Sequence, residues 1–199
     1  MFANRYTVFV DACALAGALK RNLLLTLAEA EFFRLRWSVP VLEVQRAIEG
    51  ILAGKGAEDA VERASRARAA MEKAFADAMV DEFDTFLPLC DGLPDPGDAH
   101  VLAAAMKTRA TRIVTDNLKD FPEAILAKAG IEPRATDAFI ADTIELDPGR
   151  AGAAIRRMRE RFQRPEKTPD LLLLDMEAAG LVETVDVLTA LMHQGVSER

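Results

Sequence analysis

The feature that most restricts the fold of this chain is the alternation of short strand patterns with helical patterns. Thr7–Val10 is a β-branched and aromatic run that stops at Asp11, as expected for a buried parallel strand with an acid at its carboxyl end. Leucines at helical spacing follow, from Leu15 to Leu27. Repetition of this order along the chain predicts an α/β fold with a mainly parallel sheet and right-handed crossovers.

The same alternation continues through the next hundred residues. Phe33–Val39 alternates at period two and stops at Pro40, which predicts a second strand. Thr85–Cys90 is the candidate for a third strand, which Pro88 restricts to a short or edge position. Arg112–Thr115 predicts a further strand. The predicted helices are residues 41–52, 57–79, 101–106 and 122–129, the last ending at Gly130.

Strand patterns disappear after about residue 136. Helical patterns cover Gly149–Phe162 and Leu181–Met192, and a linker is predicted from Arg164–Pro165 to Thr168–Pro169. We therefore expect two domains, an α/β domain at 1–140 and a helical C-terminal extension at 141–199. The apolar stripe of the last helix faces a core more often than an interface.

Composition excludes several classes of protein. The longest apolar runs are too short to cross a bilayer, and the N-terminus lacks the pattern of a secretion signal. Cys13 and Cys90 are too few for a disulfide framework, so we expect a cytoplasmic protein without a membrane contact. The net charge of −7 argues against coating of nucleic acid by bulk charge. The basic run from Arg150 to Lys167 is the exception, either a solvated helix face or a polyanion contact.

Acidic residues lie at the ends of several predicted elements. Asp11 and Asp116 follow strands, whereas Glu43 and Asp98 lie at helix starts. In α/β sheets the ligand site lies beyond the carboxyl ends of the strands. Crowded carboxylates repel one another and need a cation, and Mg²⁺ suits a site rich in carboxylates and poor in histidine. Such a site favours metal-assisted hydrolysis of a phosphodiester, although helix capping and turn formation also explain each acid alone.

The loop Leu93–His100 has the densest chemistry of the chain. Asp95 is a good N-cap, Pro96 suits the first helical position, and Asp98 complements the start of the helix that follows. We interpret Asp95 mainly as the residue that begins the helix and positions Asp98. His100 is a supporting neighbour that is more often a hydrogen-bonding residue than a ligand.

Three segments together carry a resemblance to a known family. Val8–Cys13 with Glu43, then Asp95–Ala105, and then Ile113–Phe121 resemble a PIN-domain protein, and more narrowly the VapC-type toxin ribonucleases of type II toxin–antitoxin systems. The resemblance covers roughly residues 5–140. It implies a three-layer α/β/α fold and an endoribonuclease that depends on Mg²⁺ or Mn²⁺. It also implies structured RNA such as tRNA as substrate, a homodimer, and a cognate antitoxin protein as inhibitor.

The resemblance assigns the acids one by one. Asp11, Glu43 and Asp98 match the three core acids of the family. Many members have a fourth acid at the position that Asn117 occupies here, beside Asp116. Either Asp116 takes over the metal role, or Asn117 contributes a neutral oxygen while Asp116 helps indirectly. Asp11, Glu43, Asp98 and Asp116 are therefore the predicted catalytic and metal-binding set.

Other residues are predicted to support this set. Thr115 orients the loop or a water, or stabilises the turn, and Cys13 stands where the family commonly has a small polar residue. We interpret Cys13 as a packing residue without a part in the chemistry. The supporting residues are Asp95, His100, Thr115 and Asn117, and the candidate RNA contacts are Arg156, Arg157 and Arg159.

The prediction is therefore a metal-dependent endoribonuclease that hydrolyses RNA phosphodiester bonds, the toxin of a toxin–antitoxin pair. A non-catalytic metal- or RNA-binding interaction module with a PIN-like fold is the alternative. A phosphohydrolase of the haloacid dehalogenase type has little support, because it needs an aspartate where this chain has Cys13.

Overall fold

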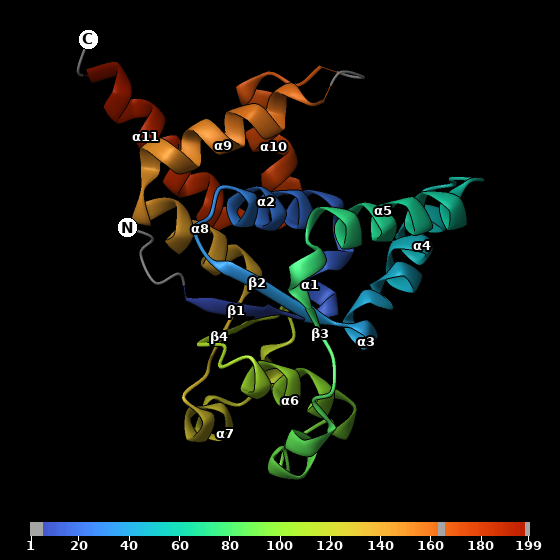
Figure 1. Ribbon diagram of the computed structural model, residues 1–199. Helices are drawn as coiled ribbons and strands as arrows, with labels where there is room; N and C mark the ends of the chain where they lie inside the picture. The colour runs from blue at the N-terminus through green and yellow to red at the C-terminus, as the bar shows by residue number, and fades with distance from the viewer. Residues whose placement is uncertain (1–5, 163–165, 198–199) are drawn as a thin grey trace. The chain divides into compact units, whose positions relative to one another are not determined.

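The computed structural model describes residues 6–162 and 166–197, and the chain forms two compact units (Figure 1). The first unit contains the residues up to Ala18 and Phe33–Ala135. The second contains Leu19–Phe32 and the residues from Thr136 on. The segment between the first two strands therefore belongs with the C-terminal part of the chain. The predicted domain boundary at 140 stays a prediction.

A parallel five-stranded sheet is the centre of the first unit. Its order is β3-β2-β1-β4-β5, so the first strand lies in the middle, as its almost wholly buried residues require. This arrangement confirms the predicted α/β fold with a mainly parallel sheet. The strands are β1 (Thr7–Val10), β2 (Arg34–Ser38), β3 (Met79–Val80), β4 (Arg112–Val114) and β5 (Glu132–Arg134).

The register of β1 and β4 determines where their carboxyl ends meet. Val10 lies opposite Val114, and the Asp11 amide donates to the Val114 carbonyl at 3.0 Å. The residues that follow, Asp11 and Thr115, are consequently neighbours at one edge of the sheet. The pairing continues on the other side of β4, where the Thr115 amide donates to the Arg134 carbonyl.

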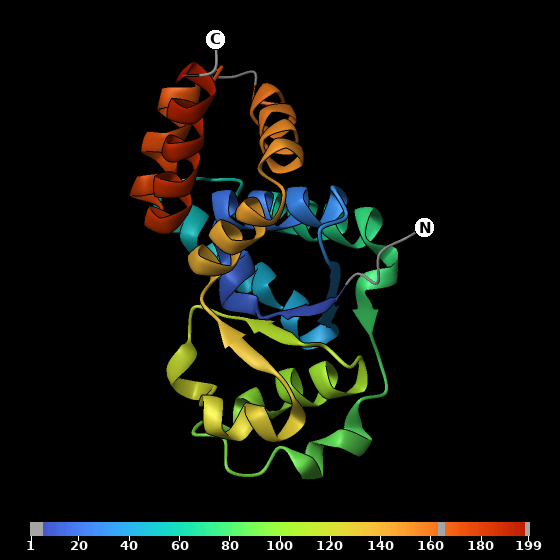
Figure 2. The same cartoon turned by 90° about the vertical axis from the view of Figure 1, so that its left-hand side faces the viewer.

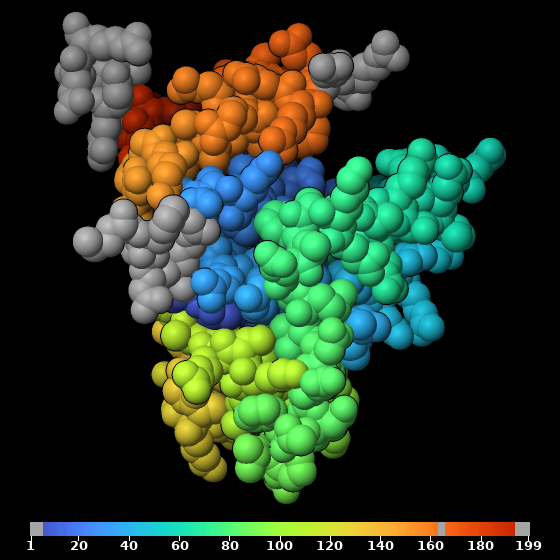
Figure 3. All heavy atoms as spheres, in the orientation of Figure 1, coloured from blue at the N-terminus to red at the C-terminus, as the bar shows by residue number. Residues whose placement is uncertain are grey.

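Helices cover both faces of this sheet, which gives the three-layer α/β/α arrangement (Figures 1 and 2). On one face lie α6 and α7, and α6 is buried on nearly every side from Val101 to Ala105 because those residues are small or apolar. On the other face α4 packs on α1 and α5, and Figure 3 shows the outer surface of the α4–α5 pair. The helices of this unit are α1 (Ala12–Ala16), α3 (Val39–Leu42), α4 (Val44–Gly54), α5 (Ala60–Ala74), α6 (Ala99–Lys107) and α7 (Glu123–Leu126).

Short 3-10 helices connect the elements, and one of them corrects a prediction. The predicted strand Thr85–Cys90 is wrong, since Thr85–Leu89 belong to η2 (Asp84–Leu89), in which Pro88 lacks the N–H that a strand ladder needs. The third strand is instead Met79–Val80, which begins at the last residue of the stretch predicted as one long helix, 57–79. The other 3-10 helices are η1 (Ala76–Ala78), η3 (Pro96–Asp98), η4 (Leu118–Asp120) and η5 (Ala127–Ala129).

Edge strand β5 was not predicted, because it has only three residues and Pro133 lies at its centre. A proline is tolerated there since only one side of an edge strand pairs. The predicted helix at 122–129 is present as α7 and η5, and it ends at Gly130 in the left-handed conformation with φ 69°.

The second unit is helical, as predicted for the C-terminal part. Within it α8 packs on α9 and α11, and α10 packs on α11. Asp137 of α8 accepts hydrogen bonds from the amides of Glu183 and Thr184 and so caps the start of α11. Thr168 caps α10, whereas Arg164–Pro165 of the predicted linker lie outside the described residues. The helices are α2 (Ala18–Glu29), α8 (Thr136–Leu146), α9 (Pro148–Glu160), α10 (Pro169–Ala178) and α11 (Val182–Ser197).

Among the described residues, no helix is both long enough and apolar enough to cross a membrane.

Candidate metal centre

Asp11 is held firmly at the carboxyl end of β1. It is only 8% exposed, and its Oδ1 accepts from the Ala12 amide at 2.6 Å, which caps α1. Its Oδ2 accepts from the Thr115 hydroxyl at 2.8 Å and from the Cys13 thiol at 3.0 Å. The orientation of this carboxylate is therefore set by groups at the ends of β1 and β4.

Cys13 and Thr115 extend this hydrogen-bond network into the loop after β4. The Asp116 amide donates to Cys13 Sγ at 3.1 Å, and the Asn117 amide donates to Thr115 Oγ1 at 3.0 Å. Cys13 therefore does more than pack, because its thiol bridges Asp11 to the loop, whereas its predicted absence from the chemistry stays a prediction. Burial first, and then the charge of Asp11, raise the pKa of Cys13 to about 11, so it is a neutral donor at physiological pH.

The loop before α6 positions two more acids. Asp95 caps η3, since its Oδ1 accepts from the Gly97 amide at 2.7 Å, as the sequence predicted for this residue. Asp98 occupies the N-cap position of α6, but its side chain makes no capping hydrogen bond. The carboxylate of Asp98 is thus not used to begin the helix.

Asp98 lies in a cluster of carboxylates with Asp95 and Asp120. One oxygen from each of the three lies within 4.8 Å of the others. Asp98 Oδ2 is buried and has no hydrogen-bond partner among the described residues. Burial first, and then the negative charges of Asp11, Asp95 and Asp120, raise the pKa of Asp98. A buried carboxylate oxygen with no donor, surrounded by other acids, is stabilised either by a proton or by a bound cation.

A hard divalent ion fits this donor set. Carboxylate oxygens are the ligands that Mg²⁺ and Mn²⁺ prefer, and Asp98 Oδ2 has no hydrogen-bond donor among the described residues that would compete with such an ion. Neutralisation of the cluster would also remove the mutual repulsion of its acids. The residues present therefore fit the group that the sequence predicted.

Asp120 is the member of this cluster that the sequence analysis did not select. It lies in η4, and its carboxylate accepts a hydrogen bond from the Asn117 side-chain amide. The signal was present as an Asn-x-x-Asp spacing directly after the strand. Asp120 comes near Asp98 only through the turn of η4. An analysis of the residues at strand ends therefore does not identify it.

Other predicted site residues lie in different surroundings. Asp116 is exposed at the end of β4, where its amide bonds to Cys13. Glu43 is exposed at the junction of α3 and α4, and its carboxylate forms an ion pair with Arg46 at 3.5 Å. It does not belong to the group of described acids whose oxygens lie within 4.8 Å. The Nδ1–H of His100 donates to the Gly97 carbonyl at 2.8 Å, so the ring supports the loop.

The predicted RNA contacts lie on α9 of the second unit, and the three arginines differ in their surroundings. Arg156 is exposed and has no ion-pair partner among the described residues. The Arg159 guanidinium donates a hydrogen bond to the Lys167 carbonyl and forms an ion pair with Glu160. Arg157 lines a pocket that α9 forms with α2.

The fold and the acidic site together define the class of protein, and the sequence comparison agrees. Residues 7–119 match the PIN domain, which is more than half of the chain, so the chain belongs to the PIN-domain family. Residues 136–190 match the VapC50 C-terminal domain.

A curated relative extends this comparison. The chain is similar to the protein named "Putative ribonuclease VapC50" of Mycobacterium tuberculosis (strain ATCC 25618 / H37Rv), with 41% identity over 76 residues. The match covers 38% of this chain and 45% of the relative, so it spans less than half of that protein's length. No solved structure matches the chain.

Proposed function

We propose that this protein is a metal-dependent endoribonuclease and the toxin of a toxin–antitoxin pair. The observation that carries the proposal is the state of Asp98, which occupies a helix N-cap position without capping and has a buried oxygen without a donor. Membership in the PIN-domain family and the similarity to a protein named as a ribonuclease support hydrolysis of RNA at this acidic site.

The proposed metal ligands come from the loop before α6 and from the segments that follow β1 and β4. Asp98, Asp120 and Asp95 supply the oxygens that lie close together, and Asp11 is near enough to raise the pKa of Asp98 through its charge. Thr115 and Cys13 hold Asp11 in one orientation by donating to the same oxygen. Since outer hydrogen-bond partners orient metal ligands, these two are positioning residues.

Each remaining acid of the predicted set has a defined place in the proposal. Asp116 and Glu43 stay candidates for further ligands, and Glu43 would have to exchange its exposed ion pair with Arg46 for the metal. Such a pair contributes only about 0–1 kcal/mol, so the exchange is inexpensive. Asn117 orients Asp120 through its side-chain amide, which favours an indirect role for this residue.

The reaction is hydrolysis of an RNA phosphodiester by water. A bound Mg²⁺ or Mn²⁺ lowers the pKa of a water molecule and stabilises the negative charge that develops on the leaving oxygen. The residues of the chain fix the ligand geometry, and the buried side of Asp98 limits the freedom of its carboxylate. Pre-organised ligands of this kind are what such catalysis requires from a protein.

Cleavage of RNA by the purified protein tests the proposal. We expect wild-type protein to cut a structured RNA such as tRNA with Mg²⁺ or Mn²⁺, and to be inactive in EDTA. Asp98→Asn and Asp120→Asn should each lower the rate about 100-fold or more, because each removes a charged ligand. Asp84→Asn is the matched control, since Asp84 is an exposed acid of the same unit. Folded wild-type protein that leaves RNA intact with either metal would favour the non-catalytic module.

The roles of Asp116 and Asn117 can be separated in the same assay. If Asp116 is a ligand, Asp116→Asn should weaken Mn²⁺ binding and activity together. If Asn117 acts by orienting Asp120, Asn117→Ala should weaken Mn²⁺ binding by about 10-fold to 100-fold. In that case Asp116→Asn would change the affinity for Mn²⁺ little.

The partners of this activity are also part of the proposal. We expect a small antitoxin protein to inhibit cleavage, a homodimer as the active form, and the cytoplasm as compartment. Co-expression with the product of the neighbouring open reading frame, followed by purification of the complex, tests the inhibitor. Mapping of RNA 5′ ends after brief induction then identifies the substrate.

A further inference from the structure

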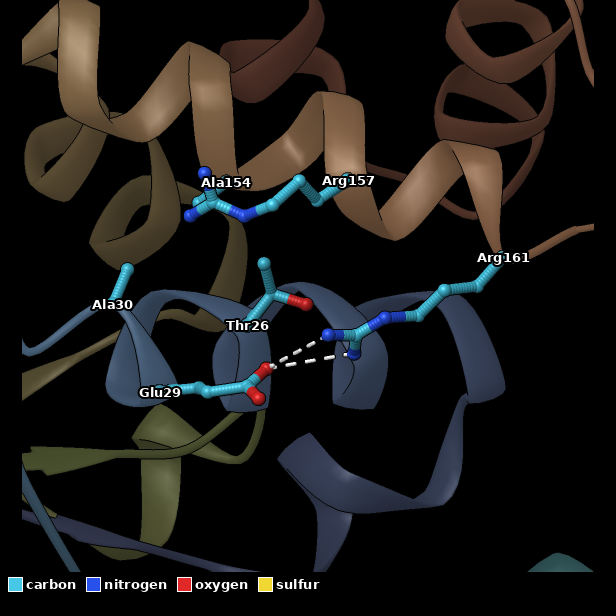
Figure 4. Close-up of a pocket in the computed structure, with 6 residues that line it drawn as sticks. All are labelled: Thr26, Glu29, Ala30, Ala154, Arg157 and Arg161. Carbon is cyan, nitrogen blue, oxygen red and sulfur yellow. Dashed lines mark hydrogen bonds and ion pairs between the residues drawn. The ribbon is translucent and has the colours of Figure 1, made fainter.

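A second charged site lies within the helical unit and is made of residues other than the acids described above. Its pocket has a volume of about 130 Å³, which is enough for a phosphate group. The walls are Thr26 and Glu29 of α2, Ala30 directly after it, Ala154 and Arg157 of α9, and Arg161 directly after α9. Figure 4 shows Arg161 reaching from α9 toward α2 and Arg157 extending over the pocket.

The helical repeat of α9 selects which arginines reach this pocket. Arg150, Ala154, Arg157 and Arg161 follow one another at intervals of three and four residues, so they share one face. At one end of this face Arg150 lies over the Phe32 ring, 4.0 Å from its centroid. The small side chain of Ala154 leaves room between the longer ones. Two arginines of the same face, Arg157 and Arg161, therefore border a single space.

The charges of the pocket are not balanced. Both terminal nitrogens of Arg161 lie 3.4 Å from Glu29 Oε2, and both side chains are more than half exposed. Arg157 has no ion-pair partner within the part of the chain that the structure describes. Two guanidinium groups against one carboxylate leave an excess positive charge, and the long exposed pair with Glu29 is weak.

We propose that this pocket binds a phosphate of the RNA backbone. This inference rests on the proposed function, and it identifies a substrate contact outside the acidic centre. Guanidinium groups present planar sets of N–H donors that match phosphate oxygens, and the Thr26 hydroxyl is a further donor in the same space. The contact carries no base specificity, because it reads only the backbone.

RNA binding without cleavage is the direct test. Full-length protein carrying Asp98→Asn, in EDTA, is titrated with a fluorescein-labelled single-stranded oligoribonucleotide, and anisotropy is followed as the KCl concentration rises. Arg157→Ala and Arg161→Ala should each weaken binding by about tenfold. Each should also reduce the slope of log K against log [KCl] by about 0.7.

Two variants distinguish phosphate binding in the pocket from a general effect of positive charge on α9. Of the three RNA contacts predicted from the sequence, only Arg157 lines the pocket, so the pocket proposal excludes Arg156. Arg156→Ala removes the same charge from the neighbouring position and, on this proposal, should change neither affinity nor slope appreciably. Thr26→Val removes the hydroxyl at nearly constant shape and charge, and should weaken binding by a few-fold without altering the slope. If Arg156→Ala weakens binding as much as Arg157→Ala and Thr26→Val has no effect, the pocket proposal is overturned.

The remaining outcomes distinguish the two proposals. If wild-type protein cuts RNA with Mn²⁺ but the pocket variants bind RNA as tightly as their parent, only the phosphate pocket is excluded. If wild-type protein cuts no RNA, the nuclease proposal fails, whatever the binding data show. A labelled polyglutamate peptide is the last probe. Tighter binding of this peptide than of RNA, lost in Arg157→Ala and Arg161→Ala, would assign the pocket to protein carboxylates and overturn the RNA proposal.

Discussion

The carboxylate of Asp98 destabilises the metal-free protein and is the central ligand of the proposed metal site. Burial and three neighbouring acids raise its pKa, so the folded protein holds its charged form less favourably than the unfolded chain does. The direction of the pH dependence follows from the linkage between proton binding and folding. The penalty is absent well below the ordinary carboxyl pKa and is fully present above the raised pKa, so metal-free stability falls as pH rises through that interval.

Asp98→Asn should therefore stabilise the metal-free protein and abolish its response to metal. In EDTA near pH 7.5 we expect a higher melting temperature than for wild type, and the gain should shrink as the pH is lowered. With Mn²⁺ at 100 times the dissociation constant, wild type should gain about 2.7 kcal/mol and the variant almost nothing. Thermal unfolding with and without Mn²⁺ measures the stability in EDTA and the stabilisation by metal, and Asp84→Asn is the control. A variant that keeps the wild-type response to Mn²⁺ contradicts the assignment.

Cys13 offers a test of positioning at the level of one atom. Cys13→Ser retains a donor for Asp11 and an acceptor for the Asp116 amide, whereas Cys13→Ala loses both. We expect Cys13→Ala to weaken Mn²⁺ binding by about 10-fold or more, and Cys13→Ser to remain close to wild type. Isothermal titration with Mn²⁺ gives the comparison. Equal losses in the two variants would mean that sulfur itself, and not its hydrogen bonds, is needed.

At the level of elements, the turn η3 connects the capping role of Asp95 to the position of Asp98. A Cβ on Gly97 would lie 3.0 Å from Asp95 Oδ1, which is closer than side chains normally approach. The Asp95 carboxylate would have to move, and with it one of the oxygens near Asp98. A side chain at position 97 would therefore displace the Asp95 carboxylate slightly.

Gly97→Ala should accordingly reduce Mn²⁺ affinity several-fold while the protein stays folded. Gly50→Ala is the matched control, because a Cβ at Gly50 in α4 meets no atom within 4 Å. There the substitution should leave Mn²⁺ affinity unchanged and raise stability by about 0.5–1 kcal/mol, as expected for alanine in a helix interior. Metal titration and thermal unfolding of both variants provide the check. If Gly97→Ala binds Mn²⁺ as wild type does, Asp95 is only a cap.

Local signals account for what the sequence predicted about the site. Asp11 and Asp95 are recognisable because a strand end and an N-cap are encoded by neighbouring residues, and the structure has both there. Asp120 depends on the turn of η4, which a pattern of strand ends does not contain. Likewise η2 has the composition of a strand, and its true conformation follows from Pro88 and from the pairing of Trp37 with Met79. The roles of the acids as ligands stay predictions.

On the scale of the whole molecule, the chain path interleaves the two units. The alternation of strands and helices was enough to predict the parallel sheet, because each βαβ step is local. It gave no sign that α2 belongs with the C-terminal helices, since the α2 partners at Ala154 and Arg161 lie more than a hundred residues further along. Contacts at such separation are not encoded by any local pattern.

A chain that stops at residue 140 should consequently be unstable, although a domain boundary was predicted there. It would lose α9, and with it the Arg150 that covers Phe32, a side chain only 6% exposed. Exposure of one phenylalanine costs about 2 kcal/mol, equivalent to a melting temperature about 5–10 °C lower. Size-exclusion chromatography and thermal unfolding of residues 1–140 against the full chain measure this. Wild-type melting behaviour of the shorter chain would support the predicted boundary.

The position of α2 also determines the order in which the protein can be completed during synthesis. The helix leaves the ribosome before β2, yet the helices of its own unit begin only at Thr136. At ordinary rates of elongation, α2 with its apolar residues Leu23, Leu24 and Leu27 is made several seconds or more before the rest of that unit. The nascent chain therefore offers apolar surface to chaperones throughout translation of the sheet, and maturation ends after the last helices emerge, not when the central strands have paired.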